Sequence, residues 1–304
     1  MTRKTPTPID LHFFEKDHHD RTRRWLGVTN LETIRQSTVL MIGAGAVGNE
    51  VCKNLGLLGI GKIILVDPDK VATSNLNRCV FFRPEDHDVK SKVDAVAERL
   101  PELATDTRID PYAIPIQEAP DSVWDVDLVL VGVDNHYARY LLNAKNLSLD
   151  SPLPLINGAM GKDFVTIDVL APPHTACLVC SWSKDFVDAI VANQVRTRCD
   201  PFFVDTLPRF PMISFVTSIV GAVMSWEATK VLVGLQQWRK TGKWQQDLKP
   251  ALGRYIKYDL QRHETSTGAI LPNPRCSEAF CRSKRKYAQS LRGLETHDLS
   301  HLPR

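Results

Sequence analysis

Short apolar runs rich in β-branched residues alternate along the chain with longer segments in which apolar residues recur at helical spacing. The short runs predict buried strands at residues 38–42, 62–66, 127–131, 154–156, 164–170 and 255–259. The helical spacing predicts helices at residues 47–58, 90–100, about 136–147 and 213–235. Gly59 and Gly61 mark the end of the first helix, and Pro101 marks the end of the second.

Strands that alternate with helices in this way predict an α/β fold, with a Rossmann-like, mostly parallel sheet and helices on both faces. Ligands on such sheets bind beyond the carboxyl ends of the strands. The loops that follow Ile42, Val66 and Val131 should therefore converge on one site.

The polarity of the chain divides it into three parts. Residues 1–36 are polar and predict an arm and a short helix, and residues 37–281 form the α/β domain. Within that domain, residues 171–211 hold several prolines and cysteines and are interpreted as a long excursion from the core. Residues 282–304 form a basic, loosely ordered tail that is expected to be solvated.

The composition is that of an ordinary soluble protein. The formal net charge is +3 and the isoelectric point is near 8.4, a bias too weak to argue for nucleic acid as a partner. No apolar stretch long enough for a membrane span is free of charge, and no apolar signal core is present, so we expect no membrane partner and a cytoplasmic protein. Seven cysteines, an odd number, favour metal ligands and free thiols over a disulfide framework.

A glycine-rich turn follows the first predicted strand and opens a helix. Gly43 permits the tight turn, Gly45 lets a phosphate approach the backbone, and Gly48 lets the helix pack on the strand. The helix N-terminus offers N–H groups to an anion. Asp67 ends the next strand and could accept hydrogen bonds from ribose hydroxyls. The glycine-rich turn and Asp67 alone are as typical of an NAD-dependent oxidoreductase as of any other nucleotide-binding enzyme.

A set of spaced polar residues beyond Asp67 favours one class of nucleotide-binding enzyme. In chain order the set is Asp69, Asn75, Arg78, Lys92, Asp134 and Asn135. Their order and spacing resemble those of the ubiquitin-activating-enzyme-like ThiF/MoeB/HesA adenylyltransferases, and the resemblance runs from about Arg21 to Cys281. It implies that ATP adenylates the C-terminal carboxylate of a ubiquitin-like or sulfur-carrier protein and that pyrophosphate is released.

The chemistry of adenylation needs these residue types. Arg78 and Lys92 can neutralise the β- and γ-phosphates, and Asn75 can hydrogen-bond a phosphate without adding charge. Asp134 is the first choice as a Mg²⁺ ligand and Asp69 the second. Hydride transfer creates no phosphate charge, so a dehydrogenase would not need this cluster. A non-catalytic partner subunit of an activating enzyme stays open as a further alternative.

An arginine-rich element precedes the first strand. The resemblance implies that an arginine here, Arg24 before Arg21, reaches the ATP phosphates of the partner subunit in a homodimer. A solvated basic turn is the alternative. His18 and His19 have no further metal ligand at sensible spacing and are expected to be surface or capping residues.

Two cysteine pairs, Cys177 with Cys180 and Cys276 with Cys281, suit a closed tetrahedral site for structural Zn²⁺. A redox pair or unpaired thiols are the alternatives. Cys199 follows Arg196 and Arg198, and neighbouring arginines lower the pKa of a thiol and favour the thiolate. By resemblance it is the candidate nucleophile for a thioester, from which a downstream conjugating enzyme would take the acyl group.

Overall fold

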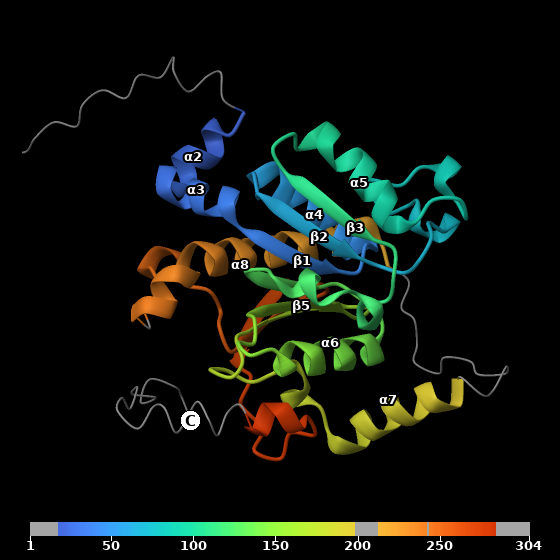
Figure 1. Cartoon of the computed structure of the whole chain (residues 1–304), viewed down its shortest axis with the longest axis vertical. Helices are drawn as coiled ribbons and strands as arrows, with labels where there is room; N and C mark the ends of the chain where they lie inside the picture. The colour runs from blue at the N-terminus through green and yellow to red at the C-terminus, as the bar shows by residue number, and fades with distance from the viewer. Residues whose placement is uncertain (1–17, 198–211, 242, 284–304) are drawn as a thin grey trace, which may run out of the picture.

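An eight-stranded sheet runs through the molecule in the order β3-β2-β1-β4-β5-β6-β7-β8 (Figure 1). The computed structural model describes residues 18–197, 212–241 and 243–283. In chain order the strands are β1 (Thr38–Ile42), β2 (Lys62–Val66), β3 (Arg108–Tyr112), β4 (Leu128–Val131), β5 (Leu155–Met160), β6 (Phe164–Leu170), β7 (Arg254–Asp259) and β8 (Glu264–Ala269). The α-helices are α2 (Asp20–Leu26), α3 (Val28–Gln36), α4 (Ala46–Leu58), α5 (Lys92–Leu103), α6 (His136–Ser148), α7 (Lys184–Thr197) and α8 (Ser214–Thr241).

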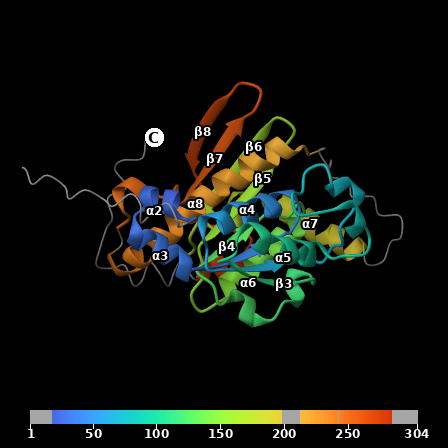
Figure 2. The same cartoon turned by 90° about the horizontal axis from the view of Figure 1, so that it is seen from above.

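The pairing of the strands confirms the predicted mostly parallel sheet. β3, β2, β1, β4 and β5 are parallel neighbours, and the remaining pairings from β5 to β8 are antiparallel. The strand order 3-2-1-4-5 reverses between β1 and β4, where a doubly wound sheet offers its ligand crevice. Figure 2 shows β7 and β8 extending beyond the layer of helices.

Helices cover both faces of the sheet, and alternate residues of each strand serve the two faces. Val39 and Met41 of β1 join the core under α3, α4, α5 and α8, whereas Leu40 and Ile42 join the core under α6 (Figure 1). All four side chains are almost fully buried. This alternation follows from the two-residue period of a strand, and it explains why β1 reads as a continuous apolar run.

Helix α8 is the central helix of one layer. A Cβ at Gly221 would lie 2.4 Å from the Cβ of Glu50, so α8 and α4 meet at a point where only glycine fits. By length and composition α8 could cross a membrane over Ser214–Trp238, but two thirds of that apolar window is buried in the fold. Its apolar residues are therefore accounted for as core, since it packs on α4, β5 and β6.

Three helical predictions were wrong in part. Helix α5 continues past Pro101 to Leu103, because the proline lies in the last turn and the Ala104 N–H still bonds the Leu100 carbonyl at 2.9 Å. Two N-terminal helices replace the predicted one, separated by Gly27 at φ +83°. The predicted excursion contains helix α7, whose amphipathic pattern the sequence reading overlooked.

Two strands, β3 and β8, were not predicted. β3 contains Pro111 and polar residues, and β8 is polar in its first four residues and almost wholly exposed. Both strands lie at the outer edges of the sheet, where proline and polar residues are tolerated. Short apolar runs in the sequence therefore predict only the strands that lie between these two.

Candidate functional site

A pocket of about 370 Å³ lies beyond the carboxyl ends of the parallel strands. Its walls come from the loops after β1, β2, β3 and β4, from α6 and from α7, and the lining includes Gly43, Asp67, Gln117, Asn135, Tyr137 and Val191. These loops meet where the strand order reverses. Convergence of the loops after Ile42, Val66 and Val131 is confirmed.

The glycine-rich turn forms one wall of the pocket, and each glycine has a separate geometric reason. Gly43 has φ +99°, a conformation that other residues rarely adopt. A Cβ at Gly48 would lie 2.0 Å from the Gly43 carbonyl oxygen. A Cβ at Gly45, the N-cap residue of α4, would meet nothing within 4 Å. Space at Gly45 is therefore left for something other than the protein.

These two glycines should respond differently to the same substitution. We expect Gly48→Ala to lower the free energy of unfolding by at least about 2 kcal/mol, because the new methyl group overlaps backbone. Gly45→Ala should change it by no more than about 0.5 kcal/mol, yet weaken ATP binding, because the methyl group would occupy the approach to the helix N-terminus. Urea unfolding and nucleotide titration of both variants provide the check. Equal losses of stability would show that the space beside Gly45 has no bearing on a ligand.

Asp67 joins the loops after β1 and β2. One carboxylate oxygen accepts a hydrogen bond from the Ala44 N–H at 2.7 Å, and the other accepts one from the Asp69 N–H at 2.9 Å. Burial raises the pKa of the Asp67 carboxyl above its ordinary value, while Lys92 and the two N–H groups act in the opposite direction. The predicted ribose contact stays a prediction, but the carboxylate lines the pocket as that contact requires.

Lys92 opens α5 beside this carboxylate. Its Nζ lies 2.6 Å from an Asp69 oxygen and 3.9 Å from an Asp67 oxygen, and its side chain is only 12% exposed. Asp69 is therefore the direct ion-pair partner of the ammonium, and Asp67 lies farther away. Asp69, the second choice for Mg²⁺, forms an ion pair with the predicted phosphate-binding lysine, and its role as a metal ligand stays a prediction.

Arg78 and Asn75 lie on the loop between β2 and α5, outside the pocket lining. Arg78 donates to the Ser74 carbonyl and to Asn77 Oδ1, and the Asn75 side chain caps its own turn by accepting from the Ala72 N–H at 3.0 Å. Burial raises the pKa of the neighbouring Cys79 thiol to about 12, an effect that the charges of Arg78 and Lys92 oppose. The charges of Arg78 and Lys92 thus both act on the Cys79 thiol.

A buried ion pair holds the same loop in place. Arg99 of α5 binds both carboxylate oxygens of Asp86, at 2.7 and 2.9 Å, and also donates to the Phe81 carbonyl at 2.8 Å. Burial alone would raise the pKa of Asp86, but the hydrogen bonds from Arg99 and from the Arg83 N–H lower it below its ordinary value. This ion pair therefore fixes the position of the loop that carries Arg78 and leads into α5.

The lowered pKa of Asp86 predicts a pH dependence of stability. The ion pair contributes fully above the unfolded pKa of about 3.9 and is lost as the pH falls through the lower folded value. We expect Asp86→Asn to cost about 3 kcal/mol at pH 6 and the difference from wild type to shrink below pH 4. Urea unfolding of both proteins between pH 3 and pH 6 measures this difference. A difference that does not depend on pH would contradict the assignment.

Asp134 and Asn135 follow β4. Asn135 is the N-cap of α6, with Oδ1 accepting from the N–H groups of Tyr137 and Ala138, and it lines the pocket. Asp134 is exposed and lies next to the pocket rather than in its lining. Its role as a Mg²⁺ ligand stays a prediction.

Sequence reasoning missed two buried polar residues on the inner face of α6. Arg139 and Asn143 lie four residues apart, and they follow Asn135 at the same spacing. Arg139 is 8% exposed and donates to the carbonyls of Val133, at 2.6 Å, and Gly158, at 3.0 Å, so it ties the loop after β4 to β5. The four-residue spacing of polar residues on a helix face that packs on a sheet was the signal available in the sequence.

Arg24 lies at the other end of the sheet. Neighbouring His19 packs on Gly59, which precedes β2, whereas the pocket lies beyond the end of that strand. Both views place α2 and α7 at opposite ends of the molecule (Figures 1 and 2). Arg24 pairs with Asp20 at 3.0 Å and does not reach the pocket of its own chain. The predicted contact with a partner subunit's nucleotide stays a prediction.

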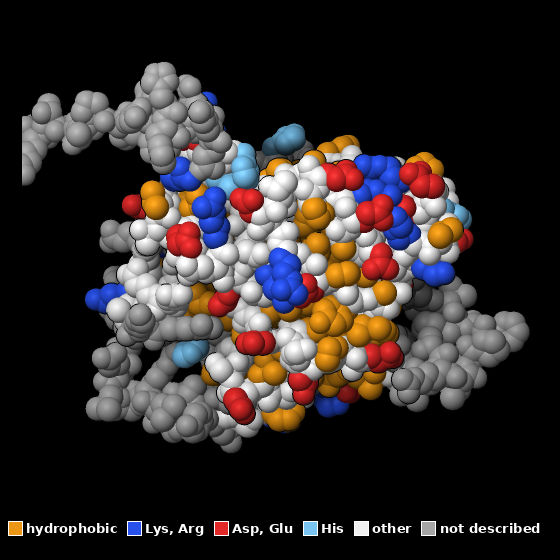
Figure 3. All heavy atoms as spheres, turned by 45° about the horizontal axis from the view of Figure 1, so that its top comes forward, with side chains coloured by type: hydrophobic (Ala, Val, Ile, Leu, Met, Phe, Trp, Pro, Cys, Tyr) orange, Lys and Arg blue, Asp and Glu red, His pale blue; other side chains and the backbone are white. Residues whose placement is uncertain are grey.

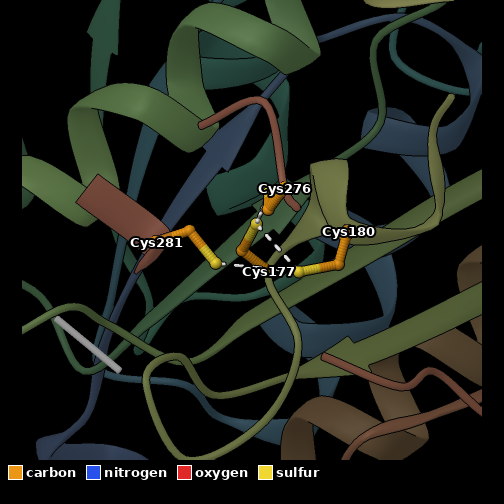
Figure 4. A group of neighbouring side chains, drawn as sticks. All are labelled: Cys177, Cys180, Cys276 and Cys281. Carbon is orange, nitrogen blue, oxygen red and sulfur yellow. Dashed lines mark hydrogen bonds between the residues drawn. The ribbon is translucent and has the colours of Figure 1, made fainter. Parts of the chain in front are cut away.

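Four buried thiols from two distant segments converge under α6 (Figure 4). The Cys177 sulfur lies 3.6 Å from that of Cys180 and 3.7 Å from that of Cys276, and the Cys180 sulfur lies 3.6 Å from that of Cys281. Sulfur atoms around a tetrahedral Zn²⁺ with Zn–S bonds of about 2.3 Å would be about 3.8 Å apart. The cluster therefore fits the predicted Zn²⁺, although the second pair has the longer C-x₄-C spacing.

The surroundings of the thiols also fit a metal. Asn143 of α6 directs its Nδ2 at the Cys177 sulfur, 3.8 Å away, and its Oδ1 accepts from the Leu178 N–H at 3.0 Å. Such contacts orient metal ligands. Hydrogen bonds from Cys177 and the other thiols lower the pKa of Cys180. Cys199 and most of the predicted basic tail lie outside the described residues.

Comparison with known proteins agrees with this arrangement. The profile of the ThiF family matches residues 19–278. Ubiquitin-like modifier-activating enzyme 5 of Bombyx mori is 30% identical over 85% of this chain and 63% of its own length. Sulfur carrier protein adenylyltransferase of Thermus thermophilus is 26% identical over 86% of this chain and 90% of its own. The chain thus spans less than two thirds of the modifier-activating enzyme but nearly all of the bacterial adenylyltransferase.

The solved structures show the same fold. The crystal structure of E. coli MccB with AMPCPP and MccA superimposes with a TM-score of 0.67 at 19% identity, covering 89% of this chain and 76% of that one. The profile match extends over most of the chain and includes the glycine turn, the loop before α5 and the first cysteine pair. The chain therefore belongs to the ThiF family.

Proposed function

We propose that this protein uses ATP to adenylate the C-terminal carboxylate of a ubiquitin-like or sulfur-carrier protein, giving an acyl-adenylate and pyrophosphate. The observation that carries the proposal is the position of Lys92, held between Asp67 and Asp69 beside the glycine-rich turn. A cation there suits the β- and γ-phosphates of a nucleotide bound at the α4 N-terminus. The names of the relatives support the same reaction.

The residues around the pocket would have different roles in nucleotide binding and in the reaction. The α4 N-terminus and Gly45 would receive a phosphate, and Asp67 would bind the ribose. Lys92 and Arg78 would stabilise the negative charge that develops as pyrophosphate leaves. Asp134 would hold Mg²⁺, which would supply positive charge to the phosphates, and the thiol cluster would hold Zn²⁺ as a structural ion.

We also propose the partners of this protein, namely a carrier-protein substrate and a second copy of the chain. One relative is named for a ubiquitin-like modifier and another for a sulfur carrier, so a small carrier protein with a free C-terminus is the proposed substrate. A homodimer would place Arg24 of one subunit at the nucleotide of the other. Thioester formation on Cys199, transfer to a conjugating enzyme and a cytoplasmic location remain parts of the proposal.

Exchange of radiolabelled pyrophosphate into ATP tests the reaction. The purified chain is incubated with Mg-ATP, labelled pyrophosphate and each of a panel of ubiquitin-like and sulfur-carrier proteins. Each carrier is also supplied with its C-terminal residue removed, as the matched control. We expect label in ATP with an intact carrier and none with its truncated form. No exchange with any carrier, together with tight NAD binding, would favour the oxidoreductase.

A non-catalytic partner subunit is the second alternative. It would bind ATP without exchange, and substitution of Lys92 would then leave its function unchanged. The paired carboxylates around Lys92 favour the catalytic interpretation, because a subunit that only binds a partner has no need for a lysine held by two carboxylates beside the glycine-rich turn.

A further inference from the structure

Two histidines and an aspartate meet at the surface, at the end of the sheet opposite the pocket. The Nε2 atoms of His18 and His19 lie 3.3 and 3.2 Å from the same oxygen, Oδ2 of Asp106. His18 and His19 precede α2, whereas Asp106 lies in the turn between α5 and β3, 87 residues after His19. At the upper left of Figure 3, histidine side chains reach the surface near acidic side chains. The sequence pattern offers no further ligand near these histidines, because Asp106 lies far along the chain.

We propose that His18, His19 and Asp106 form a second metal site, distinct from the thiol cluster, that takes a Zn²⁺-class divalent ion. The three ligand atoms all lie within 4.8 Å of one another. Around a tetrahedral ion with bonds of about 2.0–2.1 Å, neighbouring ligand atoms are about 3.3–3.4 Å apart. The two nitrogen–oxygen distances match that separation.

The surroundings fix two of the ligands in this arrangement. The His19 ring is 3% exposed and packs on Gly59, where a Cβ would lie 2.7 Å from the ring. The Thr105 hydroxyl donates to Oδ1 of Asp106 at 3.2 Å, so the other carboxylate oxygen is left to face the imidazoles. His18 is 63% exposed, and on its side water can complete the coordination sphere.

The chemistry of the three groups selects the class of ion. Imidazole nitrogen with carboxylate oxygen suits Zn²⁺, Co²⁺, Ni²⁺ and Cu²⁺, whereas Mg²⁺ and Ca²⁺ prefer oxygen ligands throughout. Burial lowers the pKa of His19, and the charges of His18 and Arg35 lower it further. Arg35 also repels a cation, and the Asp106 carboxylate offsets that repulsion.

A bound ion would attach α2 to the turn between α5 and β3. Without it, contacts of His18 and His19 with the Asp106 carboxylate link the start of α2 to that turn, and such contacts are weak at a surface. Occupancy should therefore slow amide hydrogen exchange in Asp20–Leu26, the helix that carries Arg24. The site is independent of nucleotide chemistry and does not depend on the proposed reaction.

Metal analysis after dialysis tests the site. The full-length protein is equilibrated with micromolar Zn²⁺, and zinc per chain is measured for wild type, His18→Ala and Asp106→Asn. His87→Ala is the matched control, because His87 also faces a carboxylate, Asp88 at 3.4 Å, but the described residues give it no third ligand. We expect both site variants to bind one equivalent less than wild type and the control to bind the same as wild type.

The outcomes are distinguishable from loss of the thiol-bound ion or of the fold. His18 is exposed and Asp106→Asn keeps the side-chain shape, so circular dichroism should be unchanged. Zn²⁺ should slow exchange in Asp20–Leu26 in wild type and not in His18→Ala. Equal zinc content in wild type and both site variants would overturn the proposal and leave ordinary hydrogen bonds to Asp106. Equal loss in His87→Ala would overturn it too, because binding would then be non-specific.

Discussion

Replacing Lys92 with alanine should lower the rate of ATP–pyrophosphate exchange roughly 100-fold or more, corresponding to about 2.7 kcal/mol of transition-state stabilisation. The ammonium lies 3.9 Å from Asp67, the carboxylate that accepts from the Ala44 N–H of the glycine turn, and its removal would take one positive charge from the proposed site of pyrophosphate release. The loss should appear mainly in kcat, because the charge on the bridging oxygen develops during bond cleavage. Exchange kinetics with saturating carrier measure this loss.

Lys70→Ala is the matched control for that experiment. Lys70 lies on the same loop, and its exposed ammonium donates to the Asp88 carbonyl at 3.2 Å, away from the pocket lining. Its removal should leave exchange within about twofold of wild type, as expected of a surface charge. If Lys92→Ala is as active as Lys70→Ala, Lys92 has no part in the reaction, and the non-catalytic interpretation gains support.

Replacing Cys276 with serine should remove one equivalent of zinc and destabilise the protein by several kcal/mol. Structural zinc contributes its binding free energy to folding, and that energy is on the order of 10 kcal/mol in small zinc domains. The three remaining thiolates would also be left buried without the ion that compensates them. Metal analysis and thermal unfolding with and without a chelator measure both effects, and the chelator should mimic the substitution.

Cys52→Ala separates loss of metal from loss of a buried thiol. Cys52 is fully buried in α4, and burial raises the pKa of its thiol to about 12, so it is not a thiolate at neutral pH. We expect this variant to keep its zinc and to lose about 1 kcal/mol, the typical cost of a small cavity. Unchanged zinc content in Cys276→Ser would show that the thiols bind no ion.

The parts of the fold that the sequence predicted are those with a local signature. β1, β2 and β6 were predicted to the residue because strands buried on both faces, or bounded by turn residues, read as apolar runs. The glycine turn was equally accessible, since the reasons for Gly43 and Gly48 involve backbone only a few residues away. Each of these features depends on residues that lie close together in the sequence.

The features that could not be predicted depend on contacts between distant segments. Arg99 and Asp86 pair across the loop before α5, and Arg139 bonds a carbonyl on β5. His19 meets Asp106 only because α5 returns the chain to the start of β3. Spacing along the sequence carries no information about such contacts until the order of the strands is known.

The two overlooked edge strands protect the molecule from pairing with copies of itself. An open sheet edge offers unpaired N–H and C=O groups to any other extended chain. On β3 the ring of Pro111 removes one donor from the ladder, and on β8 exposed Thr265 and Thr267 stand where apolar residues would attract a neighbour. The lack of apolar pattern that hid both strands from a reading of the sequence thus keeps the sheet at eight strands and opposes aggregation in solution.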